Sequence, residues 1–174
     1  MPNGIIVFGA NGCGKTTLGF ELARTLNMKH LDVENYYFEE SEIPYSKPRS
    51  KDTVIERMLV DIKRCDSFVL SAVTGDYGDQ ISSMYKLGVF LSVPVHIRLE
   101  RVERRSLERY GERVLVGGDM YEKEQGFLEF VKTRDLSAID EWAKTLTCPI
   151  LHLDGTKAVP ENIQLIIERY SRIK

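Results

Sequence analysis

Short apolar runs alternate with longer helical patterns along most of this chain. The apolar runs are continuous rather than alternating, which is typical of strands buried on both faces, as in a parallel sheet. They lie at residues 4–8, 30–33, 67–73, 89–93 and 149–153. We therefore expect five buried strands.

Between these runs, apolar residues recur at the spacing of three and four that characterises amphipathic helices. The pattern predicts helices over residues 15–27, 54–65, 98–113, 121–146 and 160–172. Strand and helix alternation of this kind predicts an α/β fold with a doubly wound sheet. The two helices between residues 98 and 146 have no strand between them, so they form an excursion with a hinge at Gly117 and Gly118.

Composition limits the classes of function. The chain has 174 residues, of which 43% are hydrophobic and 29% charged, and its formal net charge is −2. This size predicts one domain over residues 1–174. The near-neutral charge argues against a nucleic-acid partner, and no apolar run is long enough to cross a bilayer.

The chain ends and the cysteines indicate a compartment. Residues 1–8 lack the basic region and the long apolar region of a secretory signal. Cys13, Cys65 and Cys148 are widely spaced and form neither a disulfide framework nor a zinc pattern. We therefore expect a cytoplasmic protein with reduced thiols, which is a monomer or a homodimer and has no membrane partner.

The most specific motif is G-A-N-G-C-G-K-T at residues 9–16, which matches G-x-x-x-x-G-K-[ST]. It follows a predicted strand and begins a predicted helix, so its backbone N–H groups can surround phosphate oxygens. Lys15 is expected to reach the outer phosphates of ATP, and the Thr16 hydroxyl to bind Mg²⁺. The nucleotide-binding residues predicted from this loop are Gly9, Asn11, Gly12, Cys13, Gly14, Lys15, Thr16 and Thr17.

Two carboxylates follow the second predicted strand. Asp32 and Glu34 lie two residues apart, so an extended chain would place both on one side. Open α/β sheets bind their ligands at the carboxyl ends of the strands. Asp32 and Glu34 are therefore candidate site residues, and the alternative is that they cap a turn or a helix.

Arginines recur along the helix predicted over residues 98–113. Arg101 and Arg105 lie one turn apart and are candidate catalytic residues, because guanidinium groups stabilise the charge of a phosphoryl group in transfer. The same helix carries several glutamates at pairing distance. Some of its arginines are therefore solvated partners of these glutamates.

The chain resembles the P-loop small-molecule kinases, which include adenylate kinase, other nucleoside monophosphate kinases and shikimate kinase. The resemblance covers nearly the whole length. It rests on the loop at residues 9–16, on Asp32-Val33-Glu34, on Gly75 and Gly78, on the arginines of residues 101–105, and on Leu153-Asp154-Gly155-Thr156.

This resemblance implies a three-layer P-loop NTPase fold with a five-stranded parallel sheet in the order 2-3-1-4-5. It implies a helical lid at about residues 105–120 that closes over ATP, and an acceptor-binding segment at about residues 35–65. Asp32 would bind Mg²⁺ through water or orient the attacking hydroxyl. The loop formed by Asp154, Gly155 and Thr156 would lie near the adenine, and Arg101 would also bind the nucleotide, closing with Arg105 over the transferred group. The residues expected to bind the acceptor are Asp32, Glu34, Tyr37, Arg49 and Gly75.

The sequence departs from the family pattern on the acceptor side. Adenylate kinases hold the acceptor phosphate with arginines in two regions, but residues 35–37 and 75–80 contain no basic residue here. Lys47, Arg49 or Lys51 would have to replace them. Ser71 stands near the position of the Walker B aspartate found in many P-loop ATPases. The acceptor is therefore expected to be a hydroxyl compound with little negative charge.

The sequence supports two functions. The first is an ATP-dependent phosphotransferase that moves the γ-phosphate of Mg-ATP to a small-molecule acceptor such as a nucleoside, a nucleotide or another hydroxyl metabolite. The alternative is a P-loop nucleotide-binding or ATPase module without such an acceptor. The two differ in whether an acceptor stimulates ATP turnover.

Overall fold

A computed structural model describes residues 1–42 and 46–173. Its sheet has five strands, all paired in parallel, in the order β2-β3-β1-β4-β5. The strands are β1 (Asn3–Phe8), β2 (Lys29–Asp32), β3 (Ser67–Ala72), β4 (Tyr85–Ser92) and β5 (Ile150–Asp154). The expected strand order is confirmed. β4 begins at Tyr85, earlier than the predicted start at residue 89. The prediction missed its first residues because the exposed Lys86 interrupts the apolar run there.

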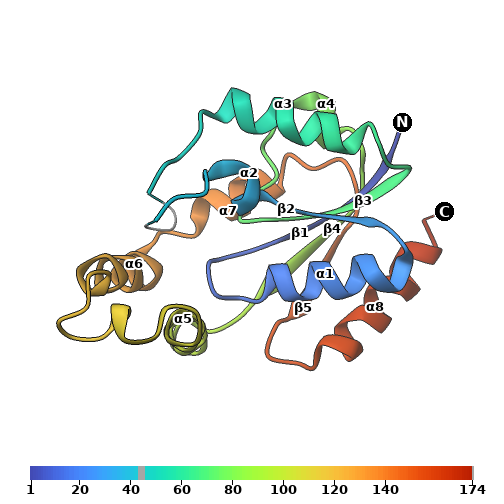
Figure 1. Cartoon of the computed structure of the whole chain (residues 1–174). Helices are drawn as coiled ribbons and strands as arrows, with labels where there is room; N and C mark the ends of the chain where they lie inside the picture. The colour runs from blue at the N-terminus through green and yellow to red at the C-terminus, as the bar shows by residue number, and fades with distance from the viewer. Residues whose placement is uncertain (43–45, 174) are drawn as a thin grey trace.

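Helices connect these strands and cover both faces of the sheet (Figure 1). They are α1 (Lys15–Leu26), α2 (Val33–Tyr37), α3 (Lys51–Ile62), α4 (Asp79–Ser82), α5 (Val95–Tyr110), α6 (Tyr121–Thr133), α7 (Ser137–Ala143) and α8 (Val159–Ser171). A 3₁₀ turn, η1 (Gly111–Val114), follows α5. None of the helices among the described residues is long and apolar enough to cross a membrane.

The single helix predicted over residues 121–146 is wrong, because the chain breaks between α6 and α7. Arg134 leaves the helical conformation at the end of α6. The Asp135 carboxylate then accepts hydrogen bonds from the N–H and the hydroxyl of Ser137, at 2.9 and 2.7 Å. Such a local bond competes with a continuous helix and starts a new one.

Two apolar cores lie on the two faces of the sheet. Ile6 and Phe8 of β1 pack on the side of α3 and α7, whereas Ile5 and Val7 pack on the side of α1 and α8. All four side chains are fully buried. β1 is therefore the centre of the molecule, and the loop that follows it has a rigid base.

The helical excursion lies beyond the carboxyl ends of the strands (Figure 1). α5 packs against α6 and η1, and these elements stand beside the loop between β1 and α1. The segment expected to be a lid, at about residues 105–120, comprises the end of α5, η1 and the connection to α6.

Candidate active site

The loop at residues 9–16 has a backbone that only glycine adopts easily at three positions. Gly9, Gly12 and Gly14 have φ values of 146°, 81° and 97°. A Cβ on Gly9 would lie 2.4 Å from the carbonyl oxygen of Leu91, and one on Gly12 would lie 2.6 Å from that of Arg98. The loop thus packs directly against the backbone of β4 and α5, with no space for side chains.

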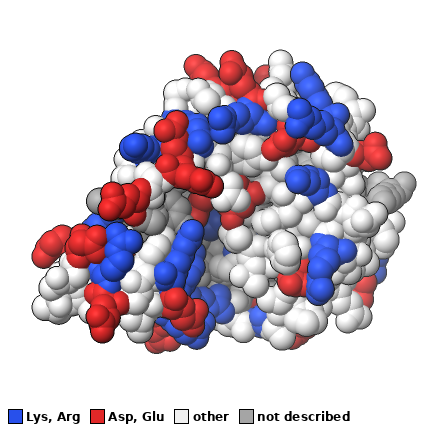
Figure 2. Space-filling view, in the orientation of Figure 1, with Lys and Arg blue, Asp and Glu red and all other residues white. Residues whose placement is uncertain are grey.

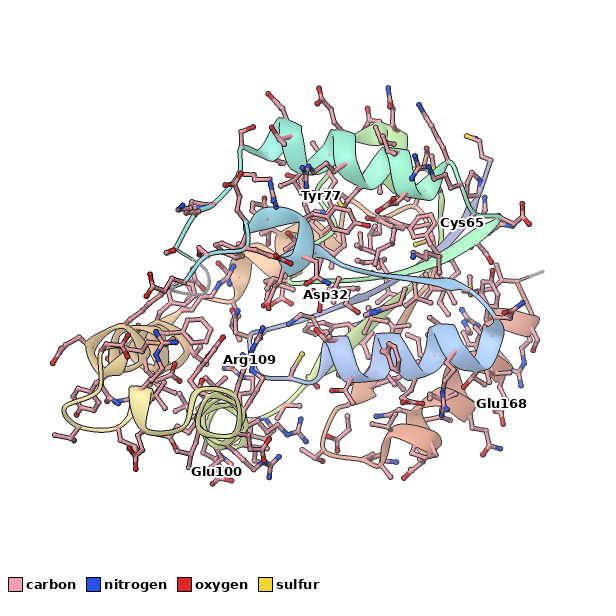
Figure 3. All side chains as sticks on the ribbon, viewed as in Figure 1. Asp32, Cys65, Tyr77, Glu100, Arg109 and Glu168 are labelled. Carbon is pink, nitrogen blue, oxygen red and sulfur yellow. The ribbon has the colours of Figure 1, made fainter. Side chains whose placement is uncertain are left out.

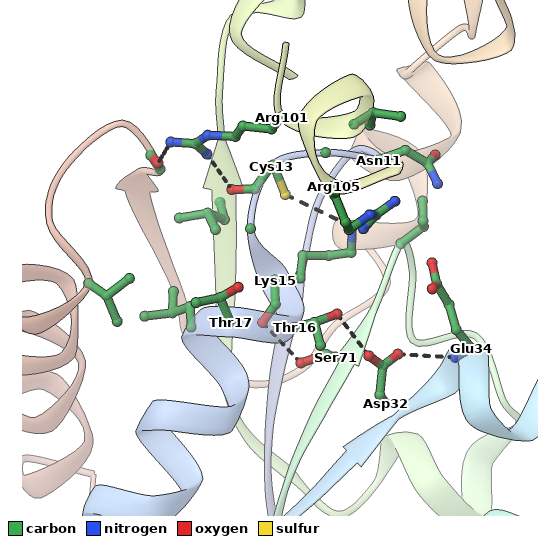
Figure 4. A pocket seen from close by; sticks show the side chains of 18 of the residues that line it. Asn11, Cys13, Lys15, Thr16, Thr17, Asp32, Glu34, Ser71, Arg101 and Arg105 are labelled. Atoms are coloured by element: carbon green, nitrogen blue, oxygen red, sulfur yellow. Dashed lines mark hydrogen bonds between the residues drawn. The ribbon is translucent and has the colours of Figure 1, made fainter. Parts of the chain in front are cut away.

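A cleft of about 410 Å³ opens beside this loop (Figure 4). Its walls come from the loop and the start of α1, the ends of β2 and β3, α5, and the connection after β5. The predicted site residues that line it are Asn11, Gly12, Cys13, Gly14, Lys15, Thr16, Thr17, Asp32, Glu34, Arg101, Arg105 and Gly155. Residues that the sequence placed in different segments therefore meet at one edge of the sheet.

Thr16 and Asp32 form the oxygen-rich part of this cleft. The Thr16 hydroxyl donates a hydrogen bond of 2.8 Å to Asp32 Oδ2. The other carboxylate oxygen of Asp32 accepts the backbone N–H of Glu34 at 3.1 Å and so caps α2. Figure 3 shows Asp32 in the middle of the molecule, between α1 and α2. Asp32 thus has the capping role and also faces the phosphate-binding loop.

These two side chains have the donor chemistry that a magnesium site requires. Mg²⁺ prefers hard oxygen ligands and retains several waters, so it is held by few protein groups. The Thr16 hydroxyl at the start of α1 and the Asp32 carboxylate at the end of β2 are in contact and fit that preference. Thr16 and Asp32 are therefore the residues that would hold Mg²⁺.

Lys15 curls back over the loop. Its Nζ donates a hydrogen bond of 2.9 Å to the carbonyl oxygen of Ala10 and lies 4.0 Å from the Sγ of Cys13, which is buried. The Lys15 ammonium is therefore held by the loop itself, and the side chain lines the cleft.

Ser71 links the base of α1 to the two neighbouring strands. Its hydroxyl donates to the carbonyl oxygen of Lys15 at 3.1 Å and lies 3.0 Å from Nε2 of His30. Burial lowers the pKa of His30, and the nearby Asp32 carboxylate raises it by a smaller amount. The position near which a Walker B aspartate was expected therefore holds a neutral hydroxyl that supports α1.

Two arginines of α5 bind the backbone of the loop. Arg98 donates from Nε to the carbonyl oxygen of Val93 and from Nη1 to that of Asn11, both at 3.2 Å. Arg101 donates from Nη1 to the carbonyl oxygen of Cys13 at 3.2 Å and from Nη2 to that of Gly155 at 2.9 Å. Both guanidinium groups are thus committed to backbone carbonyls, whereas Arg105 lines the cleft and is exposed.

Arg98 was not among the residues predicted to form the site. Its side chain is buried, which is rare for arginine. The one available signal was its spacing of three from Arg101, which places both on one face of α5. Sequence reasoning also missed several residues of the cleft wall, namely Arg104, Glu108, Lys157, Val159 and Asn162.

The far end of the helical excursion also contacts the loop. Arg134, just after α6, donates from Nη1 to the side-chain oxygen of Asn11 at 2.9 Å. Its guanidinium carbon lies 5.3 Å from the centre of the Phe130 ring, at the distance of a cation–π contact. The loop is therefore held from both ends of the excursion.

The connection after β5 is shaped by a local turn. The Asp154 carboxylate accepts the hydroxyl of Thr156 at 2.7 Å and its N–H at 2.8 Å, and these bonds lower the pKa of Asp154. Asp154 and Thr156 are not among the residues that line the cleft. Their turn directs the carbonyl of Gly155 toward Arg101, and their expected place near the adenine stays a prediction.

Four further predicted residues do not line the cleft: Gly9, Tyr37, Arg49 and Gly75. The Arg49 Nη1 donates to the carbonyl oxygens of Tyr36 and Phe38, at 3.0 and 2.6 Å. A Cβ on Gly75 would lie 2.8 Å from the Trp142 ring, so this glycine allows close packing.

The Tyr37 ring packs edge-on to that of Tyr77, at 6.5 Å between centroids. The acceptor-binding role of Tyr37, Arg49 and Gly75 stays a prediction. Residues 43–45 of the expected acceptor segment lie outside the described residues.

Comparisons with known proteins identify a relative and the fold. The sequence matches no family model. It is 32% identical over 179 residues to the uncharacterized protein YqaC of Bacillus subtilis (strain 168), and the match covers 98% of this chain and 99% of that protein.

Three solved structures with this fold are named as kinases. A putative kinase from Chloroflexus aurantiacus J-10-fl superposes with a TM-score of 0.63 at 16% identity, covering 99% of this chain and 98% of that one. A gluconokinase from Sinorhizobium meliloti 1021 gives 0.57 at 15%, covering 99% and 93%. A shikimate kinase from Acinetobacter baumannii gives 0.57 at 19%, covering 100% and 96%. At these identities the likeness shows the fold alone, which this chain shares with the three proteins.

Proposed function

The chain belongs to the family of Bacillus subtilis YqaC, and from its fold and its cleft we propose that it is an ATP-dependent small-molecule kinase. It moves the γ-phosphate of Mg-ATP to a hydroxyl group of an acceptor. One observation carries this proposal: the phosphate-binding loop and the carboxylates of Asp32 and Glu34 line the same cleft. A module that only binds nucleotide has no need of a second set of polar groups beside its phosphates.

The residues of the cleft have different roles in phosphoryl transfer, which depends on positioning and on charge stabilisation. The N–H groups of the loop and Lys15 bind the phosphates, and Arg105 faces the transferred group. Arg98 and Arg101 hold the loop in shape through its carbonyls. Mg²⁺ bound at Thr16 and Asp32 would neutralise charge on the phosphate oxygens.

The transfer exchanges one bond for another. The acceptor oxygen forms a bond to the γ-phosphorus while the bond from that phosphorus to the β–γ bridging oxygen breaks, and ADP leaves. Asp32, at the junction of the loop and the acceptor side, orients the acceptor hydroxyl toward the γ-phosphorus, and the proton of this hydroxyl passes to an oxygen of the transferred phosphoryl group. Closure of the segment at about residues 105–120 excludes water, so that ATP is not hydrolysed.

The test is ADP release from Mg-ATP in the presence of different acceptors: nucleosides, nucleoside monophosphates, sugars, sugar acids and shikimate. Stimulation by one class, abolished in Lys15→Ala and retained in Lys86→Ala, is the expected result. Lys86 is a matched control because it is an exposed lysine on β4, outside the cleft wall. Lys15-dependent ATP binding without any stimulation would instead support the nucleotide-binding module.

A further inference from the structure

The acceptor side of the cleft has a distinct chemistry. Where β2 and β3 end, the described wall consists of Asp32, Val33 and Glu34 together with Ser71, Ala72 and Val73. This part of the described wall therefore offers two carboxylates, one hydroxyl and apolar groups, and no cation. The cationic residues of the cleft belong to the loop, to α5 and to the connection after β5, which form its nucleotide side.

Glu34 has a carboxylate available for a ligand. It begins α2, is partly buried, and points toward the cleft (Figure 4). Its backbone N–H is bonded to Asp32, but its carboxylate has no hydrogen bond or ion pair with any described residue. A partly buried carboxylate requires hydrogen-bond donors, and a bound acceptor with hydroxyl or amino groups provides them.

Two of the three basic side chains that could bind an anion in the acceptor segment, Arg49 and Lys51, already contact other protein groups, whereas the third, Lys47, is exposed and does not line the cleft. The Arg49 guanidinium holds the carbonyls of Tyr36 and Phe38, and only 14% of its side chain is exposed. The Nζ of Lys51 lies 2.9 Å from Oδ2 of Asp76. Both side chains therefore have protein partners in the absence of an acceptor.

The charges on the surface around the cleft are mixed in sign. Figure 2 shows Lys and Arg side chains interspersed with Asp and Glu on the face that it presents. An anionic group placed next to Glu34 and Asp32 would be repelled at short range. At a separation of about 5 Å and an effective dielectric constant of about 20, the repulsion weakens binding by about a hundredfold or more.

From these contacts we infer that the acceptor is a hydroxyl compound that carries no phosphate or carboxylate, and that Glu34 binds it through its hydroxyl or amino groups. Neutral sugars, amino sugars and nucleosides have this chemistry. The inference rests on the proposed kinase function and makes it narrower, because sugar acids and nucleoside monophosphates are excluded. Glu34 is then a specificity-determining residue.

The experiment compares acceptors in pairs that differ by one anionic group. A nucleoside is tested against its 5′-monophosphate, and glucose and glucosamine against gluconate, by kcat/KM for ADP release from Mg-ATP. We expect the members without the anionic group to be the substrates, with kcat/KM at least about a hundredfold higher. A preference for the anionic members would overturn the inference and leave the kinase function intact, whereas no stimulation by any acceptor would overturn both.

Two glutamate variants then test the role of Glu34. Glu34→Gln keeps the shape of the side chain and removes its charge, so the KM of the preferred acceptor should rise about tenfold, with a smaller change in kcat. The same variant should reduce the discrimination against the anionic partner. Glu40→Gln, an equal change of charge at an exposed position six residues later, should change neither the KM nor the discrimination. An unchanged KM and an unchanged discrimination in Glu34→Gln would overturn the assignment.

Discussion

Replacing Arg101 by alanine should destabilise the protein as well as impair its activity. The guanidinium joins the carbonyl of Cys13 in the phosphate-binding loop to the carbonyl of Gly155 after β5, at 3.2 and 2.9 Å. Arg105, one turn later on α5, is exposed and lines the same cleft. Arg101 thus binds backbone carbonyls and Arg105 is exposed in the cleft, although the sequence suggests the same role for both.

The size of the effect follows from the two hydrogen bonds. Hydrogen bonds to charged groups are worth about 1.5–3 kcal/mol each when buried, and Arg101 is partly exposed, so about 2 kcal/mol for the pair is a reasonable value. In a domain of this size 1 kcal/mol corresponds to about 2–4 °C in Tm. Arg101→Ala should therefore lower Tm by about 4–8 °C. Arg101→Lys should lower it less, because one ammonium group still reaches one carbonyl.

Thermal unfolding of the nucleotide-free protein measures this directly, and Arg105→Ala is the matched control. Arg105→Ala should keep Tm within about 2 °C, because surface substitutions usually change stability by at most about 0.5 kcal/mol, but it should lower kcat. Arg101→Ala should lower Tm and also weaken ATP binding, because the loop loses one support. The reasoning fails if Arg101→Ala retains the wild-type Tm and loses only kcat.

Three further results are expected from other positions. Gly12→Ala should weaken ATP binding on the order of tenfold or more in a titration, because φ is 81° there and the added Cβ would press on a carbonyl of α5. Gly75→Ala should lower the free energy of unfolding in urea by about 1–3 kcal/mol, because its Cβ would overlap the Trp142 ring. His30 has a pKa below its usual 6.5, so its neutral form favours the folded state. The free energy of unfolding should therefore be highest above pH 6.5 and should decrease as the pH falls through the pKa of His30 in the folded protein. His30→Gln should make this pH dependence weaker.

The strands could be predicted because burial on both faces produces a continuous apolar run in the sequence. The main helices could be predicted because burial on one face produces apolar residues at a spacing of three and four. β1, with its continuous apolar run, is the clearest case. The short α2 has no such pattern, because it has only five residues and depends on the Asp32 cap. β4 was predicted too short because Lys86 interrupts its apolar pattern with an exposed position.

The candidate site was predicted where chemistry is carried by a local motif, and missed where it depends on contacts between distant segments. The loop at residues 9–16 and Asp32 line one cleft, as its motif and its place after a strand suggest. The bond from Arg98 to the carbonyl of Asn11 joins residues far apart in the chain. No local pattern reveals that an arginine will be buried against a backbone carbonyl, since its donors find their partner only after the sheet has formed.

The central place of β1 has a consequence for biosynthesis. β1 is the first of the five strands to leave the ribosome, but its partners on either side are β3 and β4, in which Ala72 and Phe90 pair with Phe8. At about 5–20 residues per second, β4 follows β1 by roughly 4–16 seconds. During that interval the glycine-rich loop has no β4 backbone to pack against. A nascent chain that is arrested before residue 92 should therefore be unable to retain ATP. Nucleotide binding can assist folding only after β1 has paired with both β3 and β4.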